Sequence, residues 1–193
     1  MSHTANLAQG HDSRMAREEK LERAGVHIPP GEGARSLWVM GVLVTQKIPS
    51  HRTGGAYALF EVATRPGVGP PPHIHHREDE SFYVLEGEYE FLMDGSTITA
   101  RAGSLLYFPK GTLHAHRGVG DGVGRMLVTQ TPGGLYERFF EEVGRPVEGE
   151  AGPRFFGEQP HVESVVATAA KYGIEIPSPI VEEGRHRSRR APS

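Results

Sequence analysis

The sequence predicts an all-β fold, a small antiparallel barrel or jelly roll with a polar N-terminal extension and one or two C-terminal helices. Short apolar runs follow one another along the middle of the chain, separated by turn-forming residues, and the chain contains 25 Gly and 15 Pro. The apolar spacing becomes helical after residues 132–134. No internal repeat is present, so we expect a single barrel.

Composition narrows the class of protein further. A chain of 193 residues can form one domain with a substantial core, but not two sizeable domains with tails. The absence of cysteine excludes disulfides and thiolate ligands, so a metal site would use nitrogen and oxygen donors. A net charge of −3 gives no nucleic-acid signature. No apolar run matches a membrane span or a signal peptide, so we expect a soluble, cytoplasmic protein without nucleic-acid or membrane partners.

We divide the chain into four parts. Residues 1–35 form a partly flexible N-terminal extension, and residues 36–145 form the barrel with the helix that follows it. Residues 146–180 form a C-terminal segment with a short helix. Residues 181–193 form a disordered tail, which is basic because of Arg185, Arg187, Arg189 and Arg190.

Within these parts, the sequence predicts individual helices and strands. Helices are expected over Leu135–Val143, where apolar side chains have helical spacing, and over about Val162–Tyr172; both are followed by glycine. Ser13–Ala24, with Ser13 as N-cap and Gly25 as its end, is expected to form only a marginal helix, because its apolar stripe is thin. Strands are expected at both ends of the barrel, over Leu37–Ile48, Tyr57–Thr64 and Arg125–Thr131.

Two groups of residues in the middle of the chain carry candidate metal ligands. The first group runs from a glycine through a His-x-His pair and an acid to a second glycine: Gly67, His73, His75, Glu80 and Gly87. The second group runs from a glycine through a Pro-x-Gly turn to a histidine: Gly103, Pro109, Gly111 and His114.

Strand geometry explains why this spacing suits a metal. Successive side chains of a strand point to opposite faces, so His73 and His75 share a face and can bind one ion. Glu80 opens the next apolar run, and Gly87 supplies a turn into residues 89–93, so we predict a hairpin with the ligands on its inner face. The turn at residues 109–111 predicts a second hairpin, which begins with the strand 104–108.

These residues resemble both signature motifs of the cupin superfamily, G-x5-H-x-H-x3-4-E-x6-G and G-x5-P-x-G-x2-H-x3-N. Every position matches except the last, where Gly118 replaces Asn. A looser resemblance to small single-domain cupins of the quercetin 2,3-dioxygenase-like group extends to about residue 145. The resemblance implies one divalent transition metal per chain, held by His73, His75, Glu80 and His114.

Neighbouring polar residues leave alternatives open. Asp79 is the fallback ligand if the shorter motif spacing applies, and Glu78 is expected to be an ordinary charged turn residue. His76 should face away from the metal, whereas His116 shares the parity of His114 and has either a pocket role or a structural one. Glu80 is either a purely structural ligand or also a general base towards a substrate hydroxyl, as the resemblance suggests for quercetinase-like cupins.

Three imidazoles and one carboxylate leave roughly two positions open on a six-coordinate ion, for substrate and dioxygen. The donors suit Fe, Mn, Ni, Co or Zn, and disfavour calcium and magnesium. The resemblance therefore implies a dioxygenase of a small aromatic, flavonol-like or enolic compound. The alternatives are a metal-dependent isomerase, cyclase or lyase, and a non-catalytic small-molecule-binding cupin. Phe82, Val84 and Thr112 have the parity to line the cavity, and we expect a homodimer.

Overall fold

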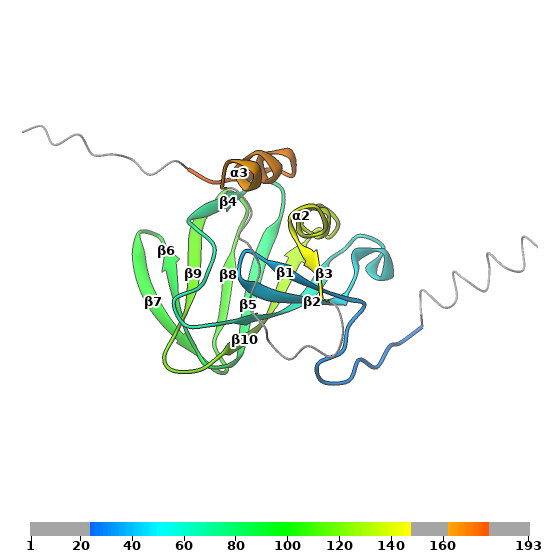
Figure 1. The fold of residues 1–193 in the computed structure, drawn as a ribbon. Helices are drawn as coiled ribbons and strands as arrows, with labels where there is room; N and C mark the ends of the chain where they lie inside the picture. The colour runs from blue at the N-terminus through cyan, green and yellow to red at the C-terminus, as the bar shows by residue number, and fades with distance from the viewer. Residues whose placement is uncertain (1–23, 148–161, 178–193) are drawn as a thin grey trace, which may run out of the picture.

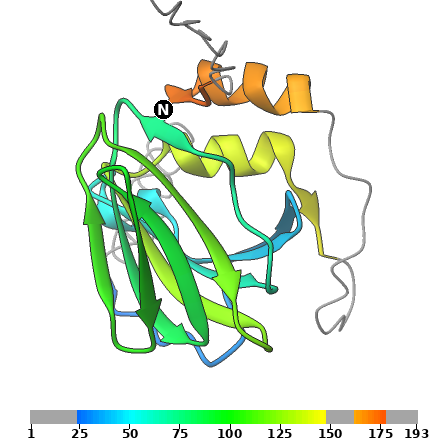
Figure 2. The ribbon, with the colours of Figure 1, turned by 90° about the vertical axis from the view of Figure 1, so that its left-hand side faces the viewer.

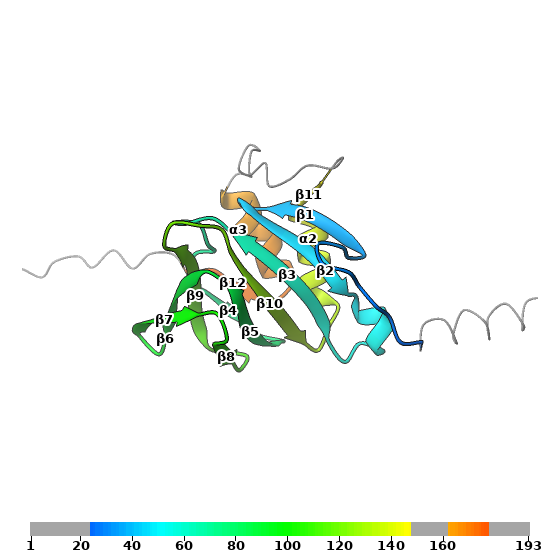
Figure 3. The ribbon, with the colours of Figure 1, turned by 90° about the horizontal axis from the view of Figure 1, so that it is seen from below.

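Two antiparallel sheets form the structure, a computed structural model that describes residues 24–147 and 162–177. The larger sheet consists, in order across it, of β11 (Arg145–Pro146), β1 (Arg35–Val39), β2 (Val42–Ile48), β3 (Ala58–Thr64), β10 (Gly124–Thr131), β5 (Asp79–Glu86) and β8 (Leu105–Phe108). The smaller sheet consists of β12 (Ile174–Glu175), β4 (His73–His75), β9 (Leu113–Val119), β6 (Glu88–Met93) and β7 (Ser96–Arg101). Figure 1 shows both sheets, and Figure 3 shows from below how the strands of the larger one follow one another. The all-β jelly-roll prediction is confirmed.

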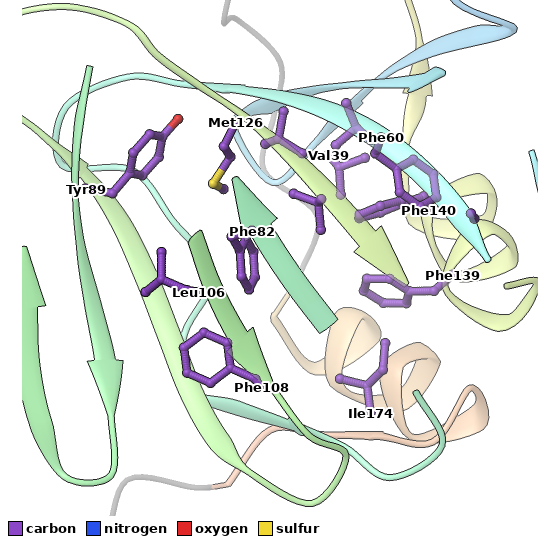
Figure 4. Packing of buried hydrophobic residues seen from close by; sticks show 14 of the residues in the cluster. Val39, Phe60, Phe82, Tyr89, Leu106, Phe108, Met126, Phe139, Phe140 and Ile174 are labelled. Atoms are coloured by element: carbon purple, nitrogen blue, oxygen red, sulfur yellow. The ribbon is translucent and has the colours of Figure 1, made fainter. Parts of the chain in front are cut away.

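The core lies between the two sheets because apolar side chains alternate with polar ones along the strands. In β3 and β10 every second side chain is buried, the pattern expected of strands with one inner and one outer face. The inner side chains include Phe60, Phe82, Phe108 and Met126, which Figure 4 shows pointing into the space between the strands. Val84, expected to line the cavity, is fully buried in this core but is not part of the lining of the pocket that reaches Glu80.

Within the described residues, three helical segments accompany the sheets: η1 (Ser50–Thr53), α2 (Leu135–Val143) and α3 (Val162–Lys171). Helix α2 buries Phe139 and Phe140 in the core, where Phe140 meets Phe60 edge to face with ring centroids 5.3 Å apart. Helix α3 contacts α2 and leads into β12, and Figures 1 and 2 show the two helices side by side at one end of the barrel. The two C-terminal helices expected from the sequence are confirmed.

Both predicted hairpins are wrong. Strand β5 pairs with β10 and β8, whereas β6 pairs with β7 and β9, so the turn at Gly87 joins strands of different sheets. Likewise β8 and β9 belong to different sheets, although a tight turn separates them. A glycine between two apolar runs signals a reversal of the chain, but it does not specify which strand each run pairs with.

The predicted strand Leu37–Ile48 is also wrong, because it is two strands. Met40 and Gly41 both have positive φ, 46° and 87°, and they turn β1 back onto β2. Methionine is unusual at such a position, so the local sequence gives only Gly41 as a signal. Strand β7 was not predicted at all; it follows a similar turn at Asp94 and Gly95 and pairs with β6.

Two sequence predictions fall outside the described residues: the helix over Ser13–Ala24, except for its last residue, and the basic tail. The four-part division of the chain stays a prediction. Within residues 24–147 and 162–177, no helix is long and apolar enough to cross a membrane.

Candidate metal centre

The four predicted ligands come together from three strands. His73 and His75 lie on β4, His114 lies directly opposite His73 on β9, and Glu80 enters from β5 in the other sheet. All four side chains are buried, and one candidate ligand atom from each lies within 4.8 Å of the others. The ring pairs are also close, since the centroids of His73 and His114 are 4.4 Å apart. A buried three-histidine, one-carboxylate cluster able to hold one metal ion is therefore present.

Backbone carbonyls orient two of the three imidazoles. The Nδ1 of His73 lies 2.9 Å from the carbonyl oxygen of Pro71, and the Nδ1 of His114 lies 3.0 Å from that of Thr112. A carbonyl can only accept, so each Nδ1 carries the proton and donates it. The other nitrogen of each ring, Nε2, is then the atom available to a metal.

Glu80 is held ionised by its surroundings. Its Oε2 lies 2.8 Å from Nε2 of His114 and 3.5 Å from Nε2 of His75. Burial by itself raises the pKa of Glu80, but the charges of the imidazoles and the hydrogen bond from His114 outweigh burial and hold that pKa at about 2. The carboxylate is thus negative at neutral pH, as a metal ligand must be.

The same neighbouring groups shift the pKa values of His73 and His114. Burial and the adjacent imidazoles lower the pKa of His73 to about 3, so its ring is neutral and its Nε2 lone pair is free. For His114, burial lowers the pKa, but the hydrogen bond to Glu80 and the carboxylate charge raise it above its usual value overall. Binding of a metal would replace the proton between His114 and Glu80.

The donors fit a divalent transition metal. His75 is buried, yet neither of its ring nitrogens has a hydrogen-bond partner. Buried polar atoms are nearly always paired, and an ion bound at Nε2 would give that nitrogen a partner. Three imidazoles with one carboxylate match the donor preference of iron, manganese, cobalt, nickel and zinc.

The structure also places residues that sequence reasoning missed. Gln130 on β10 is fully buried and donates a hydrogen bond to Oε1 of Glu80, which leaves this carboxylate with partners on both oxygens. The sequence contained a signal for Gln130. It has the same strand parity as the buried Met126 and Val128, so it is a polar side chain on the inner face of β10. The Tyr136 ring of α2 meets the His75 ring edge to face, with ring centroids 4.9 Å apart. This contact exists only because α2 packs against the barrel, so no local pattern in the sequence predicts it.

Of the neighbouring candidates, Asp79 is not brought to the cluster. Its carboxylate accepts hydrogen bonds from Tyr107 Oη and the Lys110 amide. His76 is exposed and faces away from the cluster, as its strand parity predicted. Its Nε2 lies 2.7 Å from a carboxylate oxygen of Glu175. The prediction for Glu78 is wrong, because this residue is not an ordinary exposed turn residue: only 1% of it is accessible.

A pocket inside the barrel reaches Glu80. Apolar side chains of β1, β2, β3, β10 and α2 line it, together with Phe82, Tyr136 and His116. Thr112, expected to line the cavity, is absent from its lining and contributes its carbonyl to His114 instead. The space open inside is about 40 Å³, room for only a few water molecules. A larger surface hollow beside η1 includes none of the four candidate ligands, so we place ligand binding in the inner pocket.

Comparison with known proteins agrees with this architecture. The model of the family described as "Cupin domain" matches residues 60–130, a stretch that contains all four candidate ligands. The chain is 36% identical over 126 residues to quercetin 2,3-dioxygenase of Bacillus subtilis strain 168, covering 64% of this chain and 36% of that protein. It is 28% identical over 162 residues to Germin-like protein subfamily 1 member 4 of Arabidopsis thaliana, covering 76% of this chain and 64% of that protein.

Among solved structures, a Thermotoga maritima protein described as a "predicted oxalate decarboxylase" matches with a TM-score of 0.51 and 19% identity, covering 55% of this chain and 99% of that one. At this identity the likeness concerns the fold alone. The two sheets, the inward-facing histidines and the family match define a metal-binding type of barrel, and the chain belongs to the cupin superfamily. It spans about a third of the bacterial relative and less than two thirds of the plant one.

Proposed function

We propose that this protein is a metal-dependent cupin enzyme, a dioxygenase acting on a small aromatic or enolic compound. The observation that carries the proposal is that four buried donors adjoin an apolar pocket, and that Glu80 belongs to both. The similarity to a quercetin 2,3-dioxygenase supports the reaction class, although it extends over only part of that protein. Apolar pockets with a few convergent polar groups are the usual sites for small organic ligands.

In this proposal His73, His75, His114 and Glu80 would hold the metal, which would supply a Lewis acid beside the pocket. Gln130 keeps the carboxylate of Glu80 in place through its hydrogen bond. A pKa of about 2 makes Glu80 a weak base within this cluster. The structure thus supports the ligand role more directly, and a base role towards a substrate hydroxyl stays a prediction.

The pocket limits the substrate. Phe82 and Tyr136 offer ring faces and edges, and burial lowers the pKa of His116 to about 4, so its imidazole is neutral and can exchange hydrogen bonds with a hydroxyl or carbonyl. About 40 Å³ is far less than the roughly 300 Å³ or more of a typical ligand site. A small enol would therefore need less rearrangement of the lining than a flavonol.

Oxygen consumption tests the proposal. The purified protein is analysed for bound metal, loaded with Fe, Mn, Co, Ni or Zn in turn, and supplied with flavonols and with smaller enols in an oxygen electrode. Uptake that depends on metal and is lost in His114→Ala supports the dioxygenase. Turnover without oxygen would instead establish an isomerase, cyclase or lyase. Tight binding without any turnover would establish a binding protein.

We further propose that the protein is a homodimer. The outer face of β5 and β8 exposes four large apolar side chains, Tyr83, Leu85, Leu105 and Tyr107, and β8 is the last strand of its sheet within the described residues. Burial of such a face against a second copy would remove apolar surface from water. The cytoplasmic location stays a prediction.

A further inference from the structure

A second acidic residue lies buried beside the candidate metal cluster and has no role in the function proposed above. Glu78 is 1% accessible, and neither of its carboxylate oxygens has a hydrogen-bond partner. Its Oε2 lies 3.8 Å from Nδ1 of His75, which is also buried and unpartnered. An acid in this position is costly for the fold unless something nearby compensates for it.

Comparison of the three imidazoles shows that Glu78 lies where the other two histidines have a backbone carbonyl. The Nδ1 atoms of His73 and His114 donate to backbone carbonyls, at 2.9 Å and 3.0 Å. His75 has no carbonyl in that position, and the Glu78 carboxylate faces its Nδ1. Its other nitrogen, Nε2, faces Glu80 at 3.5 Å. Each histidine thus has an acceptor behind it, and for His75 the acceptor is an acid.

We propose that Glu78 is a positioning residue for the metal, which accepts the Nδ1 proton of His75 and thereby keeps Nε2 deprotonated and directed at the ion. This inference rests on the proposed metal site. The present 3.8 Å exceeds a hydrogen bond, so the two groups must approach by roughly 1 Å when the ion is bound. A carboxylate behind a metal-bound histidine also raises the basicity of the ring and so strengthens the bond to the metal.

The surrounding backbone holds Glu78 in place. It follows β4 in a short bend, and β4 is fixed by pairing of His75 with Ile174 of β12 and by the His76 amide, which donates to the Gly173 carbonyl at 2.9 Å. The Tyr136 ring also contacts the His75 ring edge to face, with their centroids 4.9 Å apart. Burial, followed by the charges of Glu80 and Glu78, raises the pKa of Tyr136 well above its usual value, so its phenol stays protonated beside both acids.

The test measures metal affinity and fold stability separately. Wild type and Glu78→Gln are titrated with Zn(II) and with Co(II) by calorimetry, the visible spectrum of the cobalt form is recorded, and the metal-free melting temperatures are compared. We expect Glu78→Gln to bind one ion per chain about 10- to 100-fold more weakly, with an altered cobalt spectrum. Its metal-free melting temperature should be unchanged or higher, because a buried acid without a hydrogen-bond partner has been replaced.

Glu175→Gln is the matched control. It removes the carboxylate that pairs at 2.7 Å with exposed His76, next to the same strand but outside the cluster, and it should bind metal as wild type does. In a His75→Gln background, Glu78→Gln should cause no further loss of affinity, since Glu78 acts through His75. An equal loss in both backgrounds would overturn the inference.

The remaining outcomes separate this inference from the proposed function. Wild-type affinity and an unchanged spectrum in Glu78→Gln would overturn the inference and leave the metal site standing. A lower metal-free melting temperature with unchanged affinity would make Glu78 a structural residue. A wild-type protein that takes up neither ion would contradict the proposed metal site itself, and the role of Glu78 with it.

Discussion

At the scale of single residues, the character of Glu80 depends on the groups around its two oxygens. One oxygen faces imidazoles of His75 and His114, and the other accepts a hydrogen bond from Gln130. These partners make the ionised form the stable one although the side chain is buried. Gln130 therefore contributes to the site without being a ligand, because it satisfies an oxygen that water cannot reach.

Replacement of Gln130 by methionine tests this contribution. The substitution keeps the side-chain size but removes the donor, so a charged oxygen loses its partner in the interior. We expect the free energy of unfolding, measured by urea denaturation without metal, to fall by about 1–3 kcal/mol. In a Glu80→Gln background the same replacement should cost less, because the acceptor is no longer charged. Equal costs in both backgrounds would show that Gln130 acts only through packing.

At the scale of elements, charged side chains tie neighbouring strands together on the outer face of the larger sheet. Glu61 of β3 lies between Lys47 of β2, at 2.8 Å, and Arg125 of β10. Burial raises the pKa of Glu61, but Lys47 and Arg125 together outweigh it and lower that pKa below the usual value of 4.5. The ion pairs therefore favour the folded state only while Glu61 is ionised.

The pH dependence of Glu61→Gln follows from this sign. Because the folded pKa is depressed, the stabilisation is complete above about pH 4.5 and is lost as the pH falls through the folded pKa. Wild type should exceed the variant by about 1 kcal/mol in unfolding free energy at pH 7, and by progressively less in acid. Urea titrations at several pH values measure the difference. Glu90→Gln, which removes the acid of an exposed pair with Arg117, is the control. The assignment would be refuted if the difference in unfolding free energy between wild type and Glu61→Gln grew as the pH falls.

At the scale of the whole molecule, one end of the larger sheet exposes large apolar side chains on its outer face. The face at the β8 end of the larger sheet exposes 70% of Leu105 and 54% of Tyr107. These two alternate with buried Leu106 and Phe108, so the strand is apolar on both faces. A strand that faces water on one side usually carries polar residues there, and this one fits an interface with a second copy.

Replacement of Leu105 by glutamate tests the homodimer. Analytical ultracentrifugation should show wild type at about twice the 21.1 kDa chain mass and the variant shifted towards the single chain. The charge would be buried without a partner at the interface, which disfavours association. Ile98→Glu, an exposed apolar position on β7 of the other sheet, should stay dimeric. A wild-type protein sedimenting only as a single chain would refute the dimer.

Local sequence was enough for much of the site. The alternation of His73 and His75, the position of Glu80 at the start of an apolar run and the turn before His114 are local features, and the structure brings all four together as the motif resemblance implied. The partners that lie behind them were harder to find. Gln130 is fifty residues from Glu80 in sequence, and Tyr136 reaches His75 only because α2 packs on the barrel.

By itself, the sequence determined the all-β class, the two C-terminal helices and the four candidate ligands, because turn chemistry and side-chain alternation are properties of neighbouring residues. Tertiary structure decided which strands pair, so that two expected hairpins became crossings between sheets. It also decided that Glu78 is buried while its neighbour Asp79 faces outward to Tyr107 and Lys110. Strand pairing and burial depend on contacts between residues far apart in the chain, which no local pattern records.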